Sequence, residues 1–112
     1  MEIQISESGS ATLVAITGSI DGTTAGPLME RLAEEVKGGR TRLVLDFGAV
    51  DYVSSAGLRA LLATMKEARM KGGDVRLAAA RPEVARVLEL SGFTHLLKMF
   101  PDAASAAGSF SR

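Results

Sequence analysis

The chain has 112 residues, of which 46% are hydrophobic and 23% charged, and its 13 basic side chains balance 13 acidic ones. This length and composition predict a single globular domain over residues 1–112 and exclude a disordered or fibrous chain. A net charge of zero argues against a protein that binds the phosphate backbone of nucleic acids, and the absence of Cys beside a single His excludes zinc-finger, iron–sulfur and thiol chemistry.

The first third of the chain predicts a β-hairpin followed by a helix. Polar and apolar residues alternate over residues 2–6, residues 12–17 form a more apolar strand, and the polar segment 7–10 between them is typical of a turn. We expect the two strands to pair antiparallel. A polar loop over residues 18–24 leads into a helix with a Thr as its N-cap and Pro27 in its first turn. The helix has an apolar stripe and ends at two glycines: Leu28, Leu32 and Val36, then Gly38 and Gly39.

The rest of the chain alternates between strands and helices. Residues 43–47 form a nearly continuous apolar run, which is typical of a central strand covered on both faces. The helix that follows has apolar residues at i, i+3, i+4 and i+7, namely Leu58, Leu61, Leu62 and Met65. Residues 74–79 predict a further strand, and a helix over residues 82–90 places inward Val84, Val87 and Leu88. A short strand within residues 96–100 and a final helix capped by Asp102 follow.

This order of elements, β-β-α-β-α-β-α-(β)-α, indicates a single α/β domain. Helices that follow strands imply parallel neighbours joined by right-handed crossovers, and the hairpin adds an antiparallel edge. We therefore expect a mixed, mostly parallel sheet with an antiparallel N-terminal hairpin, packed by about four helices. No apolar run is long enough to span a bilayer and the N-terminus resembles no signal sequence, so we expect a cytoplasmic protein without membrane insertion.

The segment most suggestive of function is Asp51-Tyr52-Val53-Ser54-Ser55-Ala56-Gly57-Leu58, which connects the central strand to the most strongly patterned helix. In open α/β sheets, connections at the carboxyl ends of strands form the functional face. Two hydroxyls lie here beside unpaired backbone N–H groups of the helix, where anionic groups are favoured. One Ser is accounted for if it caps the helix, although no Glu or Gln three positions later completes a capping box. The second Ser is then left without a structural role.

Other site chemistries find weaker support. A hydrolase is disfavoured because Val53 occupies the first glycine position of the nucleophile elbow, and because His95 directly follows a helix end, which favours a surface position over a general base. Asp21, Asp46 and Asp51 are each more simply local hydrogen-bond acceptors than ligands of a magnesium cluster. No glycine-rich phosphate loop is present. We therefore expect neither an enzyme nor a bound cofactor or metal.

The chain resembles the STAS domain family in three stretches, which are GSIDGTTA, LVLDFGAVDYVSSAGLRALL and GGDVRLAAARPEVARVLELSGFTHLLKMFPD. The likeness is to the bacterial anti-sigma-factor antagonists in particular, and it covers nearly the whole chain. It implies a mixed sheet with helices packed on it, which agrees with the order of elements above. It also implies that the protein binds a GHKL-type anti-sigma factor serine kinase, that this kinase ends the interaction by phosphorylating a Ser, and that a PP2C-type phosphatase reverses the modification.

The family's loop pattern, Asp-Ser-(Ser/Thr)-Gly-Leu, places the phosphorylated Ser of this resemblance at Ser55. Ser54 stands where Asp is common in the family, which removes a negative charge beside the acceptor. Asp21 matches an acidic position that the family places near the acceptor. The resemblance implies a partner-binding surface made by the two loops: Asp21, Gly22, Thr23, Thr24, Ser54, Ala56, Gly57, Leu58 and Arg59. The alternative is a structural STAS subunit of a transport or signalling assembly that is not phosphorylated.

Overall fold

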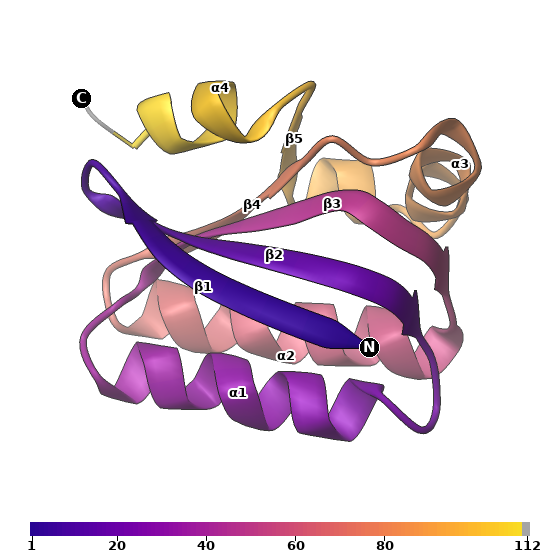
Figure 1. Cartoon of the computed structure of the whole chain (residues 1–112), viewed down its shortest axis with the longest axis horizontal. Helices are drawn as coiled ribbons and strands as arrows, with labels where there is room; N and C mark the ends of the chain where they lie inside the picture. Colours follow the sequence, from indigo (N-terminus) through magenta and orange to yellow (C-terminus); the bar gives the residue numbers. More distant parts are fainter. Residues whose placement is uncertain (111–112) are drawn as a thin grey trace.

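In the computed structural model, which describes residues 1–110, strands and helices alternate along the chain much as the sequence predicts (Figure 1). The last two residues of the domain predicted over residues 1–112 lie outside the described residues. The strands are β1 (Glu2–Ser8), β2 (Ala11–Ile20), β3 (Arg42–Val53), β4 (Asp74–Ala78) and β5 (Lys98–Phe100). The helices are α1 (Ala25–Lys37), α2 (Ser55–Met70), α3 (Pro82–Leu90) and α4 (Ala103–Gly108), with a 3₁₀ turn, η1, over Phe93–His95.

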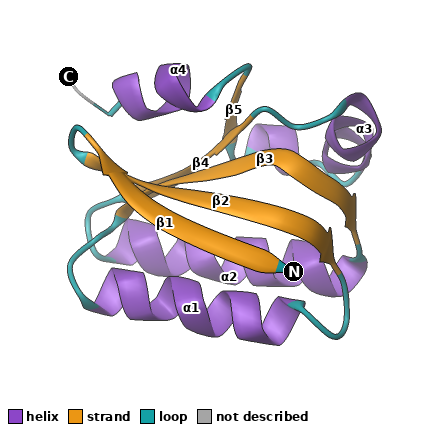
Figure 2. Ribbon diagram, viewed as in Figure 1, coloured by secondary structure: helices purple, strands orange, loops and turns teal. Residues whose placement is uncertain are grey.

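The strands form one mixed sheet in the order β1-β2-β3-β4-β5. β1 and β2 pair antiparallel as a hairpin, and the other neighbours pair parallel. α1 and α2 lie side by side under one face of the sheet, whereas α4 lies over the opposite face and α3 packs beside β3 (Figure 2). The short strand predicted within residues 96–100 is β5. The predicted α/β fold with its antiparallel N-terminal hairpin is therefore confirmed.

The main core lies between the sheet and the layer formed by α1 and α2. The predicted apolar stripe of α1 is fully buried here. The central strand β3 contributes to this core Leu43, Leu45, Phe47, Val50 and Val53. Its Val44 instead packs in a smaller cluster under α4, on the other face of the sheet. The prediction of a central strand covered on both faces is confirmed. Burial of apolar surface stabilises the folded state by about 25 cal/mol per Å², so the buried side chains of β3 contribute strongly to stability.

β2 and β3 are both longer than the sequence pattern predicts. The second apolar strand continues to Ile20, and the central strand continues to Val53. Two register shifts between these strands each place one extra residue in β3, so the alternation of buried and exposed side chains is interrupted twice. Bulges of this kind hide the period of a strand from sequence analysis. The loop predicted over residues 18–24 is therefore shortened to residues 21–24, and the connection into α2 is shortened to Ser54.

Two details of the helices also differ from prediction. Val87 of α3 is 37% exposed, because this short helix buries only the narrow stripe of Val84 and Leu88 against the core. Thr24 occupies the N-cap position of α1, as predicted, but its side chain forms no capping hydrogen bond with the helix. Asp102 caps α4 as predicted, with its carboxylate accepting a backbone N–H of the first turn at 2.7 Å.

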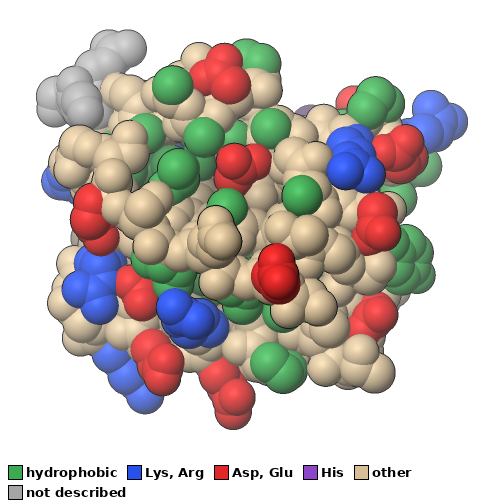
Figure 3. Space-filling model, viewed as in Figure 1, with side chains coloured by type: hydrophobic (Ala, Val, Ile, Leu, Met, Phe, Trp, Pro, Cys, Tyr) green, Lys and Arg blue, Asp and Glu red, His purple; other side chains and the backbone are tan. Residues whose placement is uncertain are grey.

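Acidic and basic side chains are interspersed on the face of the molecule shown in Figure 3. This mixing matches the balanced charge of the chain, and it gives that face no continuous basic field of the kind that a phosphate backbone would attract. Among the helices of residues 1–110, none has the length and apolar character needed to cross a membrane.

Candidate functional site

Two loops lie side by side at the carboxyl ends of β2 and β3. The last residues of these strands, Ile20 and Val53, are register partners, and the Ser54 backbone N–H donates a hydrogen bond to the Ile20 carbonyl at 2.8 Å. The chain leaves β2 through residues 21–24 into α1 and leaves β3 through Ser54 into α2, so both helices begin at this end of the sheet (Figure 1). The structure therefore brings together the two segments that the sequence singled out.

The two adjacent serines at the start of α2 have different roles. Ser54 is the N-cap, with an extended backbone, and its Oγ accepts a hydrogen bond from the Gly57 backbone N–H at 3.2 Å. Ser55 is the first residue of the helix and is exposed, and its hydroxyl has no hydrogen-bond partner among residues 1–110. The sequence did not decide which of the two serines caps the helix, and the structure shows that it is Ser54. Ser55 presents its hydroxyl at a helix N-terminus, beside backbone N–H groups that lack partners within the helix.

Gly57 allows α2 to begin close to the end of β2. A Cβ placed on Gly57 would lie 2.8 Å from the Ile20 carbonyl oxygen, 2.9 Å from Ile20 Cγ2 and 3.0 Å from Val53 Cγ1. Real Cβ atoms are not found that close to a backbone oxygen, so only glycine fits without a shift of the helix. Gly57 is also buried. Gly57 therefore has a packing role within the chain, and its place on the partner-binding surface stays a prediction.

Asp21 organises the loop between β2 and α1. Its carboxylate accepts hydrogen bonds from the Thr23 hydroxyl at 2.7 Å and from the backbone N–H groups of Thr23 at 2.9 Å and Thr24 at 3.3 Å. These bonds, the Thr23 hydroxyl first among them, lower the pKa of Asp21 below its ordinary value of 3.8, so the loop carries a negative charge at neutral pH. The Thr24 hydroxyl donates to the Ser19 carbonyl at 2.8 Å and accepts from the Asp21 N–H at 2.9 Å, which explains why it does not cap α1.

The other members of the predicted partner-binding surface are accessible to different extents. Gly22 and Thr23 are exposed at the tip of the first loop. Ala56 and Leu58 are half-buried and pack against the main core. Arg59 is exposed on α2 and forms no ion pair among residues 1–110. Within residues 1–110, the residues predicted for this surface therefore contribute the negative loop of Asp21, the unbonded hydroxyl of Ser55 and the unpaired cation of Arg59.

Sequence reasoning missed two features beside these loops. Tyr52 exposes 54% of its surface, and the Ser19 hydroxyl donates a hydrogen bond to the Asp51 carboxylate at 2.7 Å, across β2 and β3. An aromatic side chain in a strand is more typical of a packed position, and here the register shift in β3 leaves it outside the core. The available signal was the spacing of Val50 and Val53, which breaks a strict period of two.

Within residues 1–110, the structure does not favour the magnesium cluster or the hydrolase considered above. The carboxylates proposed for a magnesium cluster accept local hydrogen bonds instead, that of Asp46 from the Gly48 N–H at 2.9 Å and that of Asp51 from Ser19. Within residues 1–110, no three His, Asp or Glu side chains are grouped so that they could hold a metal ion. His95 lies exposed in η1, as expected for a surface residue.

Comparison with known proteins places this geometry in context. The family model for the STAS domain matches residues 2–106. BtrV of Bordetella bronchiseptica, provisionally named an anti-sigma factor antagonist, is 33% identical over 110 residues, which cover 98% of this chain and 95% of BtrV. A Thermotoga maritima crystal structure, provisionally named an anti-sigma factor antagonist, superposes with a TM-score of 0.93 at 17% identity, over 98% of this chain and 95% of that one.

The anti-sigma factor antagonist SpoIIAA has been solved in two states that both share this fold. Its unphosphorylated form superposes with a TM-score of 0.84 at 18% identity, over 98% of this chain and 96% of that one. Its phosphorylated form, from Bacillus, gives a TM-score of 0.74 at 17% identity, over 97% of this chain and 99% of that one. At these identities the likeness concerns the fold.

Proposed function

The chain belongs to the STAS domain family, and we propose that it is an anti-sigma-factor antagonist that acts as a phosphorylation-controlled partner switch. In this proposal its unphosphorylated form binds a GHKL-type anti-sigma factor serine kinase, and phosphorylation of Ser55 ends the binding. The observation that carries the proposal is the contrast between the two serines, since Ser54 caps α2 and Ser55 is exposed without a hydrogen-bond partner among residues 1–110. The name of BtrV and the two states of SpoIIAA support the same class of function.

The fold should tolerate a phosphate on Ser55. Phosphorylation adds about −1.5 to −2 charges, and a helix N-terminus stabilises nearby negative charge by about 0.3–1 kcal/mol. The ionised Asp21 carboxylate in the neighbouring loop opposes it by a comparable amount after screening. These two effects nearly cancel, so we expect the free energy of unfolding to change by less than about 1 kcal/mol.

The same phosphate should oppose partner binding. Ser55, Arg59 and the exposed tip of the Asp21 loop share one end of the sheet. A kinase pressed against this surface would have to desolvate the phosphate or face it with its own carboxylates, and either arrangement weakens the complex by several kcal/mol. A PP2C-type phosphatase restores the surface by removing the phosphate. The chain supplies an acceptor and a binding surface in this scheme, and the chemistry belongs to its two partners.

The proposal is tested by incubating the protein with ATP and the candidate GHKL-type kinases of its own organism, followed by intact mass and phosphopeptide mapping. We expect one phosphate on Ser55, no incorporation into Ser55→Ala, and at most a changed rate for Ser54→Ala. A phosphate mapped to Ser54 would refute the choice of acceptor. If the protein neither bound the kinase nor accepted phosphate, the alternative of a structural STAS subunit would replace this proposal.

A further inference from the structure

A second surface lies along β5, at the edge of the sheet opposite β1. β5 pairs with β4 on one side only, so its other side presents backbone N–H and C=O groups that have no strand partner among residues 1–110. A hollow of about 700 Å³ follows this edge, between β5, η1 and the C-terminal part of α2. The residues that line this hollow include Arg69, His95, Leu96, Lys98, Met99 and Phe100.

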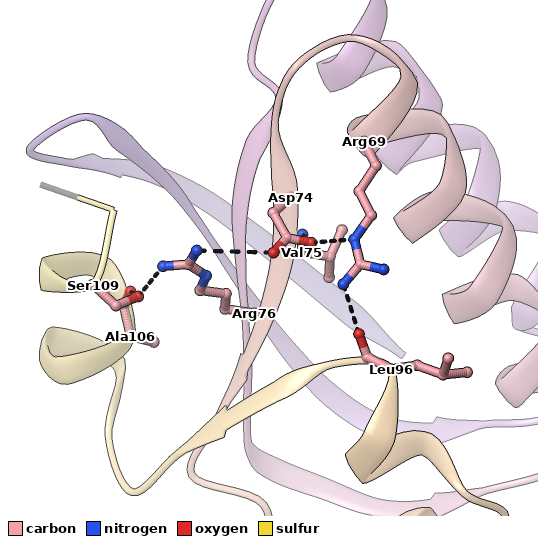
Figure 4. Close-up of polar contacts among 7 residues, drawn as sticks. All are labelled: Arg69, Asp74, Val75, Arg76, Leu96, Ala106 and Ser109. Carbon is pink, nitrogen blue, oxygen red and sulfur yellow. Dashed lines mark hydrogen bonds and ion pairs between the residues drawn. The ribbon is translucent and has the colours of Figure 1, made fainter. Parts of the chain in front are cut away.

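The lining of this hollow carries cationic side chains and no acidic one. Lys98 is exposed and forms no ion pair within residues 1–110. Arg69 reaches from α2 toward two neighbouring segments (Figure 4). Its Nε donates to Oδ1 of Asp74, the first residue of β4, at 2.8 Å and forms an ion pair with it, and its Nη2 donates to the carbonyl of Leu96, just before β5, at 2.6 Å. These two bonds fix the Arg69 guanidinium at the rim. His95, which is exposed in η1, lines the same hollow.

Both faces of β5 offer contacts to an added strand. Successive residues of a strand point to opposite faces, and accordingly Met99 packs against the main core while Phe100 packs in the cluster under α4. Both side chains are half-buried, so part of their apolar surface remains beside the open edge. Arg69, on α2, belongs to the face of Met99, whereas Lys98 shares the face of Phe100. The face of Phe100 therefore carries the unpaired Lys98, and the face of Met99 carries Arg69, whose charge is shared with Asp74.

We propose that this edge binds an extended acidic segment of a partner protein, which pairs with β5 as an additional strand. Backbone hydrogen bonds provide the affinity in this mode of binding, and alternate side chains provide the selectivity. Apolar and acidic side chains in the segment match the pairs found on the two faces of β5. A symmetric pairing of β5 with the same strand of a second copy is disfavoured, because β5 consists of Lys98, Met99 and Phe100 and would offer no acidic side chain to the unpaired Lys98 of either copy.

This edge is remote from the proposed phosphorylation site. Ser55 and Arg69 lie at opposite ends of α2, and the rise of the helix separates them by about 20 Å. This separation exceeds the screening length of about 8 Å at physiological ionic strength. The acidic segment should therefore bind equally well whether or not Ser55 carries a negative charge, which makes the inference independent of the proposed function.

The test is an NMR titration of the full chain with a short capped peptide of alternating Glu and Val. We expect amide shifts confined to β5, η1 and the end of α2, and a dissociation constant about fivefold to tenfold weaker in Lys98→Glu, because an attraction becomes a repulsion. The matched control is Arg31→Glu, which reverses an exposed cation on α1 and should leave the affinity within about twofold. Ser55→Asp should also leave it unchanged.

Two further peptides separate strand addition from charge attraction. A peptide of alternating Lys and Val and a Glu-Val peptide with an N-methylated backbone should both fail to bind, since the first has the wrong charge and the second cannot pair. Equal binding of either peptide, or no shifts at about 1 mM of the Glu-Val peptide, would overturn the proposal. It would also be overturned if the protein alone associated head to tail through β1, whose Glu2 and Glu7 make it the acidic edge of the sheet.

Discussion

Replacement of Gly57 by Ala tests the packing that positions Ser55. The added Cβ would meet the Ile20 carbonyl oxygen at 2.8 Å, and this atom belongs to the backbone and cannot rotate away. The start of α2 must therefore move away from β2. Overpacking of this kind destabilises by about 1–3 kcal/mol, whereas the better helix propensity of Ala returns about 1 kcal/mol. The net expectation is a loss of up to about 2 kcal/mol in the free energy of unfolding.

Gly26→Ala is the matched control for this change, because it makes the same substitution near the start of the other covering helix. A Cβ on Gly26 meets no atom within 4 Å, so only the gain in helix propensity remains, and we expect a small stabilisation. Chemical denaturation of both variants measures the free energies directly, and the melting temperature of Gly57→Ala should fall by about 4–8 °C for each kcal/mol lost. If Gly57→Ala proved as stable as Gly26→Ala, the account of this close approach would be refuted.

Three further predictions concern the same end of the sheet. Ser54→Ala should lose about 1 kcal/mol of stability with its cap, whereas Ser55→Ala should stay within about 0.5 kcal/mol of the wild type in thermal melting; equal losses would contradict the division of roles. Arg59→Glu should weaken kinase binding by about 1–3 kcal/mol in calorimetry while the melting temperature stays unchanged, and wild-type affinity would remove Arg59 from the surface. Because folding lowers the pKa of Asp21, its carboxylate contributes stability that is present above its unfolded pKa near 3.8 and is lost as the pH falls through the folded value. The difference in melting temperature between wild type and Asp21→Asn should therefore be present at pH 7 and shrink in acid, and a constant difference would refute this linkage.

Hydrophobic periodicity predicted most of this fold because most elements bury one regular face. The stripe of α1 and the apolar run at the start of β3 follow the periods of a helix and of a doubly covered strand, and both are buried as expected. The second half of β3 does not follow a regular strand period, because two extra residues shift its register against β2. A bulge depends on pairing with a distant strand, so local sequence carries little trace of it.

The candidate site was predictable in position but not in detail. The presence of two adjacent serines before a strongly patterned helix indicated a cap and a spare hydroxyl, but nothing local decided which Ser was the cap. That choice depends on the length of β3, since the strand ends at Val53 and leaves Ser54 alone between strand and helix. The packing role of Gly57 was missed for a related reason. A Cβ at position 57 would clash with Ile20, which is distant in sequence and becomes a neighbour only through the β2–β3 pairing.

The family resemblance implies Asp at the position of Ser54, and the hydrogen bond of the cap explains how Ser can take its place. Asp and Ser are about equally good at an N-cap, because either side chain accepts a backbone N–H of the first turn. Ser54 makes that bond with Gly57, so the helix keeps its start without the acidic residue that is common at this position. The Asp21 loop, across the β2–β3 pairing, still supplies a negative charge at this end of the sheet. If Ser55 accepts the phosphate, as we propose, Ser in place of Asp alters the electric field at that hydroxyl while the helix cap stays intact. We therefore expect this difference to change kinase recognition and phosphorylation rate rather than stability.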